Sequence, residues 1–249
     1  MKVSVIIPVY NEFRTFRQVL ERVRRATLPE GCSMEIIVID DGSTDGTAQM
    51  LREQAQTGIV VAHHSARNFG KGAALRTGIE LASGDVVLIQ DGDLEYDPQD
   101  YARVLEPIVK GRAEVVYGSR FLGATPAGMA FRNRLANRIL TAAANLLYRA
   151  QITDEATAYK AFRASTLRQL RLECQRFEFC PEVTAKLRRL GYRIREVPIS
   201  YNPRGIAEGK KIRAQDGLEA LWTLVRYRVA PRRSLVRTAG AGLVSAREN

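Results

Sequence analysis

Several residue types that mark specialised protein classes are scarce in this sequence. It holds three cysteines and two histidines among 249 residues. Cys32, Cys174 and Cys180 include no closely spaced metal-binding pair, so we expect free thiols and a reducing compartment. His63 and His64 are adjacent, and neighbouring strand residues point to opposite faces, which argues against a shared zinc site. A disulfide-rich or zinc-dependent protein is therefore not expected.

Long apolar runs are missing as well. A helix that spans a bilayer needs about 18 apolar residues. The longest stretch that leans apolar, Leu135–Leu147, is interrupted by polar side chains. The apolar residues 3–9 are too few for a signal peptide. We therefore expect a cytoplasmic chain that does not cross a membrane, and peripheral attachment to the cytoplasmic membrane face is compatible with this.

Acidic residues are outnumbered by basic ones. The 38 Lys and Arg residues exceed the 27 Asp and Glu residues, which leaves a formal net charge of +11. Such a surface favours anionic partners, for example nucleotides, nucleic acid or an anionic membrane. Hydrophobic residues make up 45% and charged residues 26% of the chain, as in ordinary globular proteins, so disorder is not expected.

The first half of the chain alternates strand and helix patterns. Buried strands are predicted at residues 3–7, 34–39, 59–62, 85–89 and 113–117. Helices are predicted at 15–25, 73–82 and 101–109, with another that Ser43 or Thr44 caps and that runs through Met50 and Leu51. This order predicts an α/β fold with a mostly parallel central sheet and helices on both faces.

The second half is more helical and more basic. Helices are predicted at 129–149, 181–190 and 216–227, and a strand at 194–199. We expect one domain over residues 1–205 and a basic amphipathic extension over 206–249. The last dozen residues are rich in Ala and Gly, so we expect them to be frayed.

Polar segments follow the predicted strands at Pro8–Glu12, Asp40–Gly46 and Gln90–Asp97. Ligands of open α/β sheets bind beyond the carboxyl ends of the strands, so these segments should converge on one crevice. Asp91-Gly92-Asp93-Leu94-Glu95, the acidic loop, presents alternating carboxylates to a common side. Hard cations such as Mg²⁺ take carboxylate and phosphate oxygens together, so a metal bridging to a diphosphate is predicted. The alternative is a solvated turn.

Two further segments complete this picture. Asp41 is placed to accept hydrogen bonds from a ribose or base, with a turn and helix cap as the alternative. In the glycine loop (Asn68–Gly72), the glycines would let the backbone approach a ligand closely, and Lys71 would meet a phosphate. Neither a GxxxxGK[ST] nor a GxGxxG motif is present, which argues against a Walker ATPase and a dinucleotide-binding domain.

Together these motifs resemble the inverting family-2 glycosyltransferases, whose nucleotide-sugar-binding fold is called GT-A. The resemblance is carried by Pro8–Glu12, Asp40–Thr47, Asn68–Gly72 and Asp91–Asp93 in that order. A closer resemblance is to the dolichyl-phosphate mannosyltransferase and polyprenyl-phosphate glycosyltransferase branch. It is suggested by Gly118–Phe121, Thr157–Arg163, Phe177–Glu182, Glu196–Tyr201 and Glu208–Lys211, and it covers about residues 3–228.

The resemblance implies roles for individual residues. The nucleotide sugar would be held by Pro8, Tyr10, Glu12, Ile39, Asp41, Lys71, Asp91, Gly92 and Lys211. Asp91, Asp93 and Glu95 would bind Mg²⁺ or Mn²⁺ with the donor diphosphate. Arg120 would contact a phosphate of donor or acceptor, and Arg204 would be a further phosphate-facing cation. Arg132 and Arg134 are candidates for the acceptor phosphate, with plain surface charge as the alternative.

The expected reaction is metal-dependent transfer of a hexose from GDP-mannose or a UDP-sugar to polyprenyl phosphate, with Asp93, Arg120 and Asp154 as catalytic candidates. An ionised lipid phosphate can attack without a strong base, whereas a hydroxyl acceptor needs one, and Asp154 or Glu155 would be available. A saccharide, lipid or protein hydroxyl acceptor is therefore the alternative.

A non-catalytic nucleotide-sugar or RNA-binding protein is a further possibility. The acidic crevice argues against a nucleic-acid partner. Many relatives in this branch carry C-terminal membrane helices and this chain shows none, so a peripheral enzyme and one anchored through a membrane partner both fit.

Overall fold

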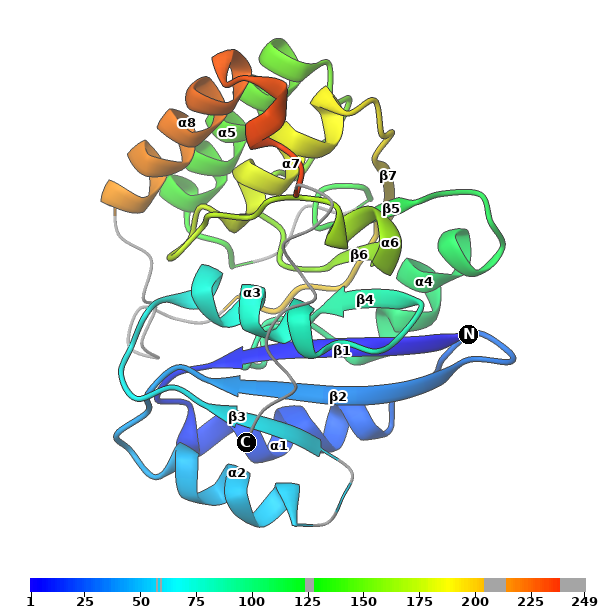
Figure 1. The fold of residues 1–249 in the computed structure, drawn as a ribbon, viewed down its shortest axis with the longest axis vertical. Helices are drawn as coiled ribbons and strands as arrows, with labels where there is room; N and C mark the ends of the chain where they lie inside the picture. Colours follow the sequence, from blue (N-terminus) through cyan, green and yellow to red (C-terminus); the bar gives the residue numbers. More distant parts are fainter. Residues whose placement is uncertain (57, 59, 124–127, 204–213, 238–249) are drawn as a thin grey trace, which may run out of the picture.

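A seven-stranded sheet forms the centre of the computed structural model (Figure 1). The structure describes residues 1–249 except 57, 59, 124–127, 204–213 and 238–249. The strands are β1 (Lys2–Val9), β2 (Ser33–Asp40), β3 (Val60–His64), β4 (Val86–Ile89), β5 (Val115–Ser119), β6 (Lys160–Arg163) and β7 (Arg195–Pro198). Their order in the sheet is β3-β2-β1-β4-β6-β5-β7.

Most strand pairs are parallel, as predicted. β2 pairs in parallel with β1 and β3, β1 with β4, and β5 with β7. Only β6 runs antiparallel to its neighbours, β4 and β5, in the described part of the sheet. This strand was not predicted, because its four residues include the charged Lys160 and Arg163, which hide an apolar pattern.

Helices cover both faces of the sheet, as predicted (Figure 1). One face packs against α1 (Phe13–Arg24), α2 (Thr47–Ala55) and α4 (Tyr101–Val109), and the other against α3 (Lys71–Leu81), α6 (Ala164–Arg168) and α7 (Phe179–Arg189). The helices α5 (Phe131–Tyr148) and α8 (Ala214–Val229) pack on α7 as a further layer. Short 3₁₀ turns are η1 (Pro98–Asp100) and η3 (Arg232–Ser234).

The apolar pattern of β1 explains how one strand contributes to two cores. Val5 and Ile7 belong to the core beneath α1, whereas the intervening Ile6 belongs to the core beneath α3. Successive strand side chains point to opposite faces, so a strand buried on both sides is almost continuously apolar.

The turn after β2 differs from the prediction. Neither Ser43 nor Thr44 caps α2, which begins at Thr47 behind the left-handed Gly46. The Ser43 hydroxyl instead accepts a hydrogen bond from Asn11 N at 2.9 Å, and Asp45 Oδ1 accepts one from Thr47 N at 3.1 Å. The predicted cap is therefore wrong, because Ser43 ties the turn to the end of β1.

The predicted domain boundary after residue 205 falls within 204–213, outside the described residues, and stays a prediction. The predicted fraying of the last dozen residues also lies outside the described part of the chain.

Two helical glycines provide a test of the packing. A Cβ at Gly78 in α3 would lie 2.3 Å from Ile6 Cγ2, whereas one at Gly217 in α8 would meet nothing within 4 Å. We expect Gly78→Ala to lower the free energy of unfolding by about 1–3 kcal/mol through overpacking. Gly217→Ala should raise it by about 0.5–1 kcal/mol. Urea unfolding of both variants measures the difference, and equal stability of the two would contradict this packing.

Candidate active site

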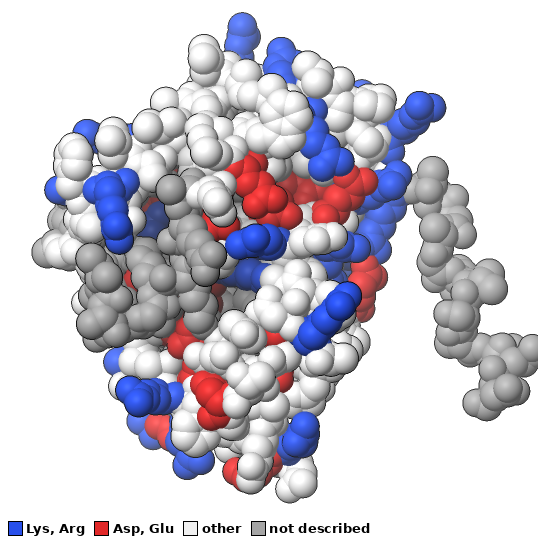
Figure 2. Space-filling model, turned by 90° about the vertical axis from the view of Figure 1, so that its left-hand side faces the viewer, with Lys and Arg blue, Asp and Glu red and all other residues white. Residues whose placement is uncertain are grey.

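The carboxyl ends of the parallel strands bring the predicted segments to one edge of the sheet. Asp41 follows β2, Asp91 follows β4 and Arg120 follows β5. Because β6 is antiparallel to both β4 and β5, those two strands point the same way, and β6 begins at the edge where they end. Figure 2 looks onto this side, where Asp and Glu side chains gather near the middle with Lys and Arg beside them.

Gln90 holds the start of the acidic loop. Its side chain is fully buried, and its Oε1 accepts hydrogen bonds from the hydroxyls of Tyr101 at 2.7 Å and Tyr159 at 2.6 Å. Its Nε2 donates to Asp91 O at 2.9 Å. The prediction from sequence missed this residue, although an amide directly after an apolar strand was a usable signal.

The acidic loop meets Lys71 from the glycine loop. Lys71 Nζ forms an ion pair with Asp91 Oδ1. Asp93 is largely buried, and its Oδ1 accepts a hydrogen bond from Glu95 N at 2.9 Å. Burial alone would lower the pKa of Lys71, but the nearby carboxylates of Asp91 and Asp93 raise it. The structure therefore brings a charged ammonium and two carboxylates together.

The donor set of this loop fits a divalent cation bound together with a phosphate. Among the described residues, no three His, Cys, Asp or Glu side chains form a ready-made metal centre. Asp91 and Asp93 offer hard oxygen ligands, and Mg²⁺ commonly takes one or two carboxylates while substrate phosphates and water fill the other positions. Glu95, the predicted third ligand, lies within hydrogen-bonding reach of the Tyr201 hydroxyl.

Arg120 is held in place by Asp154. Its Nε and Nη2 each donate to one Asp154 oxygen at 2.7 Å, and its backbone N donates to Oδ2 at 3.0 Å. Its guanidinium also lies 4.9 Å from the ring centroid of Tyr201. Both Asp154 oxygens are thus engaged and the side chain is fully buried. This geometry describes a carboxylate that positions Arg120 rather than an exposed base.

Glu196, which was not predicted as a site residue, secures the same loop from β7. Its Oε2 accepts hydrogen bonds from Thr153 N at 2.7 Å and Thr153 Oγ1 at 2.9 Å, and its Oε1 accepts one from Asp154 N at 3.1 Å. Nothing in the local sequence links these residues, which lie more than 40 positions apart.

Glu155 is the other residue considered as a base. Its side chain is fully buried. Burial raises its pKa to about 8, so it is mainly protonated at neutral pH. The buried Lys160 donates to the Glu155 backbone O at 2.9 Å. Neither Asp154 nor Glu155 is therefore exposed to receive a proton from an acceptor hydroxyl.

Asp41 and the glycine loop hold each other. The Asp41 oxygens accept hydrogen bonds from Phe69 N at 2.8 Å and Gly70 N at 2.7 Å. Burial raises the pKa of this carboxyl, although those two hydrogen bonds act against the rise. Ile39, predicted to hold the nucleotide, has its side chain in the core beneath α3. Pro8 is buried in β1, whereas Tyr10 and Glu12 lie partly exposed just after it.

Backbone atoms of the protein itself lie close to Gly70 and Gly72. Gly72 N donates to Arg176 O at 2.8 Å and Ala73 N to Gln175 O at 2.9 Å. A Cβ at Gly70 would lie 2.5 Å from Gln175 O. The space beside these two glycines is therefore taken by protein backbone, and the approach of a ligand to this loop stays a prediction.

The predicted acceptor cations lie apart from the acidic loop in sequence. Arg132 is exposed and Arg134 half-buried near the start of α5, and neither forms an ion pair within the described structure. Arg204 and Lys211 lie outside the described residues.

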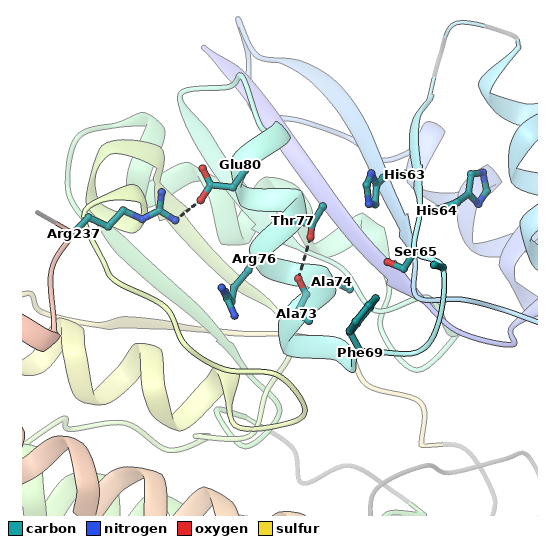
Figure 3. A pocket seen from close by; sticks show the side chains of 11 residues that line it. His63, His64, Ser65, Phe69, Ala73, Ala74, Arg76, Thr77, Glu80 and Arg237 are labelled. Carbon is teal, nitrogen blue, oxygen red and sulfur yellow. Dashed lines mark hydrogen bonds and ion pairs between the residues drawn. The ribbon is translucent and has the colours of Figure 1, made fainter. Parts of the chain in front are cut away.

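A hollow lies beside α3 and the end of β3 (Figure 3). It encloses about 460 Å³ and is lined in part by His63, His64, Phe69, Arg76, Glu80 and Arg237. None of the predicted site residues lines it. The hollow is therefore separate from the acidic loop.

Comparison with known proteins identifies the family. Residues 4–171 match the family described as Glycosyl transferase family 2. The chain belongs to this family. The undecaprenyl-phosphate mannosyltransferase of Micrococcus luteus is 32% identical over 244 residues, which cover 93% of this chain and 96% of the relative. The family resemblance seen in the sequence is confirmed.

Other relatives are longer. Glycosyltransferase AglJ of Haloferax volcanii is 32% identical over 81% of this chain, but the chain spans only 63% of its length. Glycosyltransferase AglD of the same organism is 28% identical over 98% of this chain, which spans 40% of AglD.

The predicted GT-A-type fold is also confirmed. Glucosyl-3-phosphoglycerate synthase from Mycobacterium tuberculosis, solved with Mn²⁺, UDP and phosphoglyceric acid, has a similar fold with a TM-score of 0.68. The match covers 92% of this chain and 79% of that chain at 21% sequence identity.

The buried Glu155 predicts a pH dependence of stability. Its pKa rises from an ordinary 4.5 to about 8 on folding, so the stability contributed by the protonated form is full below about pH 4.5 and is lost as the pH rises to about 8. Glu155→Gln should remove this loss, so urea unfolding from pH 5 to 8.5 should show the variant gaining stability relative to the wild type. Glu53→Gln, at an exposed position, serves as the control and should follow the wild type. Parallel curves for Glu155→Gln and wild type would show that Glu155 is ionised in the folded protein.

Proposed function

We propose that this glycosyltransferase moves a hexose from a nucleoside-diphosphate sugar to polyprenyl phosphate at the acidic loop. The main support is the juxtaposition of Asp91 and Asp93 with the cation Lys71, at the edge of the sheet where Arg120 also follows its strand. The Micrococcus luteus relative, named for undecaprenyl-phosphate mannosyl transfer, supports this acceptor class over nearly the whole chain.

Asp91 and Asp93 would hold Mg²⁺ or Mn²⁺ together with the donor diphosphate. When bound, such an ion neutralises charge on the leaving diphosphate. Lys71 and Arg120 are fixed before substrate arrives, by Asp91 and Asp154 respectively. Preorganised cations stabilise developing negative charge without a cost of reorganisation during the reaction. Tyr10, Glu12 and Asp41 would border the nucleotide.

The burial of both candidate bases favours a phosphate acceptor over a hydroxyl. A lipid monophosphate is already ionised at neutral pH and needs no proton acceptor, whereas a hydroxyl does. Asp154 and Glu155 are both fully buried, and Asp154 is occupied by Arg120. The hydroxyl-acceptor alternative therefore has less support in this geometry.

The acceptor lipid would be reached through the paired helices α5 and α8 (Figure 1). None of the described helices is both long and apolar enough to span a bilayer. Exposed apolar side chains nevertheless recur every three or four residues on both helices, and they form the apolar helix face: Phe131, Leu135, Ile139, Leu218, Trp222 and Val225.

Arginines flank the apolar helix face at Arg132, Arg138 and Arg226. Apolar residues bordered by basic ones are typical of helices that lie in the interface of an anionic membrane. We therefore propose peripheral membrane attachment through this face. Arg132 and Arg134, near Phe131, would then meet the phosphate of the acceptor lipid.

An assay with radiolabelled GDP-mannose, UDP-glucose and UDP-GlcNAc tests the reaction. Each donor is incubated with undecaprenyl phosphate and either Mg²⁺ or Mn²⁺, and the lipid is extracted. We expect label in the lipid phase with one donor, and a loss of at least about a hundredfold in Asp93→Asn, because a ligand to the metal and diphosphate is removed. Label that stays in the aqueous phase with every donor contradicts the proposed acceptor.

Vesicle sedimentation tests the attachment. Trp222 and Leu218 are 65% and 70% exposed, so replacing both by Ala leaves the core intact. We expect at least about a tenfold loss of affinity for vesicles of phosphatidylglycerol and phosphatidylcholine, given the apolar area removed. Leu81→Ala, in an exposed position on α3, is the control. Wild-type affinity of the double variant would rule out this face as the attachment surface.

A further inference from the structure

Glu182 on α7 is a buried acid that the proposed reaction does not use. It is 1% exposed, and four donors converge on its carboxylate. Oε1 accepts hydrogen bonds from Glu173 N at 2.8 Å, Lys186 Nζ at 2.5 Å and Tyr227 OH at 3.0 Å. Oε2 accepts one from Cys174 N at 2.7 Å. The charge is thus fully satisfied without reaching solvent.

A buried ion pair of this kind is a poor way to gain stability alone. Lys186 is fully buried one helical turn from Glu182 and also donates to Arg171 O. Taking both charges out of water costs several kcal/mol per ion, and apolar residues of similar volume often replace such pairs without loss. The directional hydrogen bonds to Glu173 N and Cys174 N therefore point to a role in holding the backbone there.

Glu182 holds the first half of the segment that covers the start of α3, through Glu173 N and Cys174 N. Glu178 holds the second half, because its carboxylate accepts hydrogen bonds from Gln175 N at 2.5 Å and Arg176 N at 2.9 Å. Residues 173–176 place Gln175 O and Arg176 O against the amides of Ala73 and Gly72. The fit is tight, because a Cβ at Gly72 would lie 2.9 Å from the backbone carbons of Cys174 and Gln175. A displacement of this segment therefore must displace the first turn of α3.

The first residue of α3 is Lys71, whose ammonium pairs with Asp91. An uninterrupted series of contacts thus runs from the Glu182 carboxylate through residues 173–176 and the start of α3 to Lys71. Tyr227 connects α8 to the same carboxylate.

We propose that Glu182 is a positioning residue for Lys71: together with Glu178 it fixes the 173–176 segment, and this segment fixes the turn from which the Lys71 ammonium reaches the donor diphosphate. The inference rests on the proposed function for its effect on catalysis. It also makes a structural claim that is measurable without activity, namely that Glu182 secures the amides of Gly72 and Ala73.

The first experiment measures hydrogen–deuterium exchange in Glu182→Gln, which keeps the size of the side chain but removes its charge. Peptides covering residues 71–75 should exchange faster than in wild type, because one of the two carboxylates that hold their acceptor segment is lost while Glu178 still holds Gln175 N and Arg176 N. Glu106→Gln is the matched control, since Glu106 forms an exposed pair with Lys110 at the same i,i+4 spacing. Unchanged exchange at 71–75 in a folded Glu182→Gln protein overturns the proposal.

The second experiment is a double-mutant cycle of donor kinetics with Glu182→Gln and Lys71→Ala. We expect Glu182→Gln to lower kcat/KM for the donor by about tenfold to a hundredfold, as for a misplaced catalytic group, with the acceptor KM unchanged. The double variant should be no worse than Lys71→Ala alone, because Glu182 acts through Lys71. Additive losses contradict the positioning role.

Tyr227→Phe keeps the inference testable if Glu182→Gln folds poorly. This change removes one of the four donors and preserves the aromatic packing. It should therefore cause a smaller increase in exchange at residues 71–75 than Glu182→Gln does. Unchanged exchange at residues 71–75 in Tyr227→Phe would count against the proposal. A wild-type protein that transfers no sugar would refute the proposed function, whereas the exchange measurement would still decide the role of Glu182.

Discussion

Charge balance at the carboxyl edge of the sheet is the constraint on which the site depends. Asp91 and Asp93 follow a strand that is buried on both faces, and both carboxylates act on Lys71, whose pKa they raise. Lys71 compensates part of that charge from α3, and Asp154 in turn compensates Arg120. Asp91 and Arg120 are therefore each held by a partner from a different element.

These partners fix the orientation in which the charged groups would face a substrate. A bidentate pair such as Arg120–Asp154 has a defined orientation, unlike a solvated surface pair. Gln90 and Glu196 extend the same principle to the backbone, because they fix the loops that carry Asp91 and Asp154. The loops of the site are thus held by the polar side chains of neighbouring elements as well as by their own contacts.

The fold was largely predictable because its strands are apolar on both faces and alternate with amphipathic helices. The helix at Tyr101–Val109 was predicted with the bounds that the structure shows. Strand β6 was not predicted, because Lys160 is buried over the ring of Tyr117 through a contact between residues far apart in the chain. The helix start at Thr47 was not predicted, because the Ser43 hydroxyl accepts a hydrogen bond from Asn11 N and does not cap α2.

The site was predictable only in part. The acids and cations stand in motifs that follow strand ends, so their gathering at one edge could be inferred from sequence order. Their partners could not, because Glu196 and Glu182 act on residues of other elements through contacts that no local pattern encodes. The glycine loop shows the same limit: its composition indicated a close approach, but not that the approaching group is the protein's own backbone.

The contact between the glycine loop and residues 173–176 has a consequence for how small this enzyme can be made. The region that matches the family ends at residue 171, whereas the carbonyls that complete the first turn of α3 come from residues 175 and 176. A truncated chain ending at the family boundary would keep every acid of the acidic loop and yet leave two helix amides uncovered. The structural unit that completes α3 therefore extends past the segment that matches the family, and a loop exchange between relatives has to transplant both pieces as a pair.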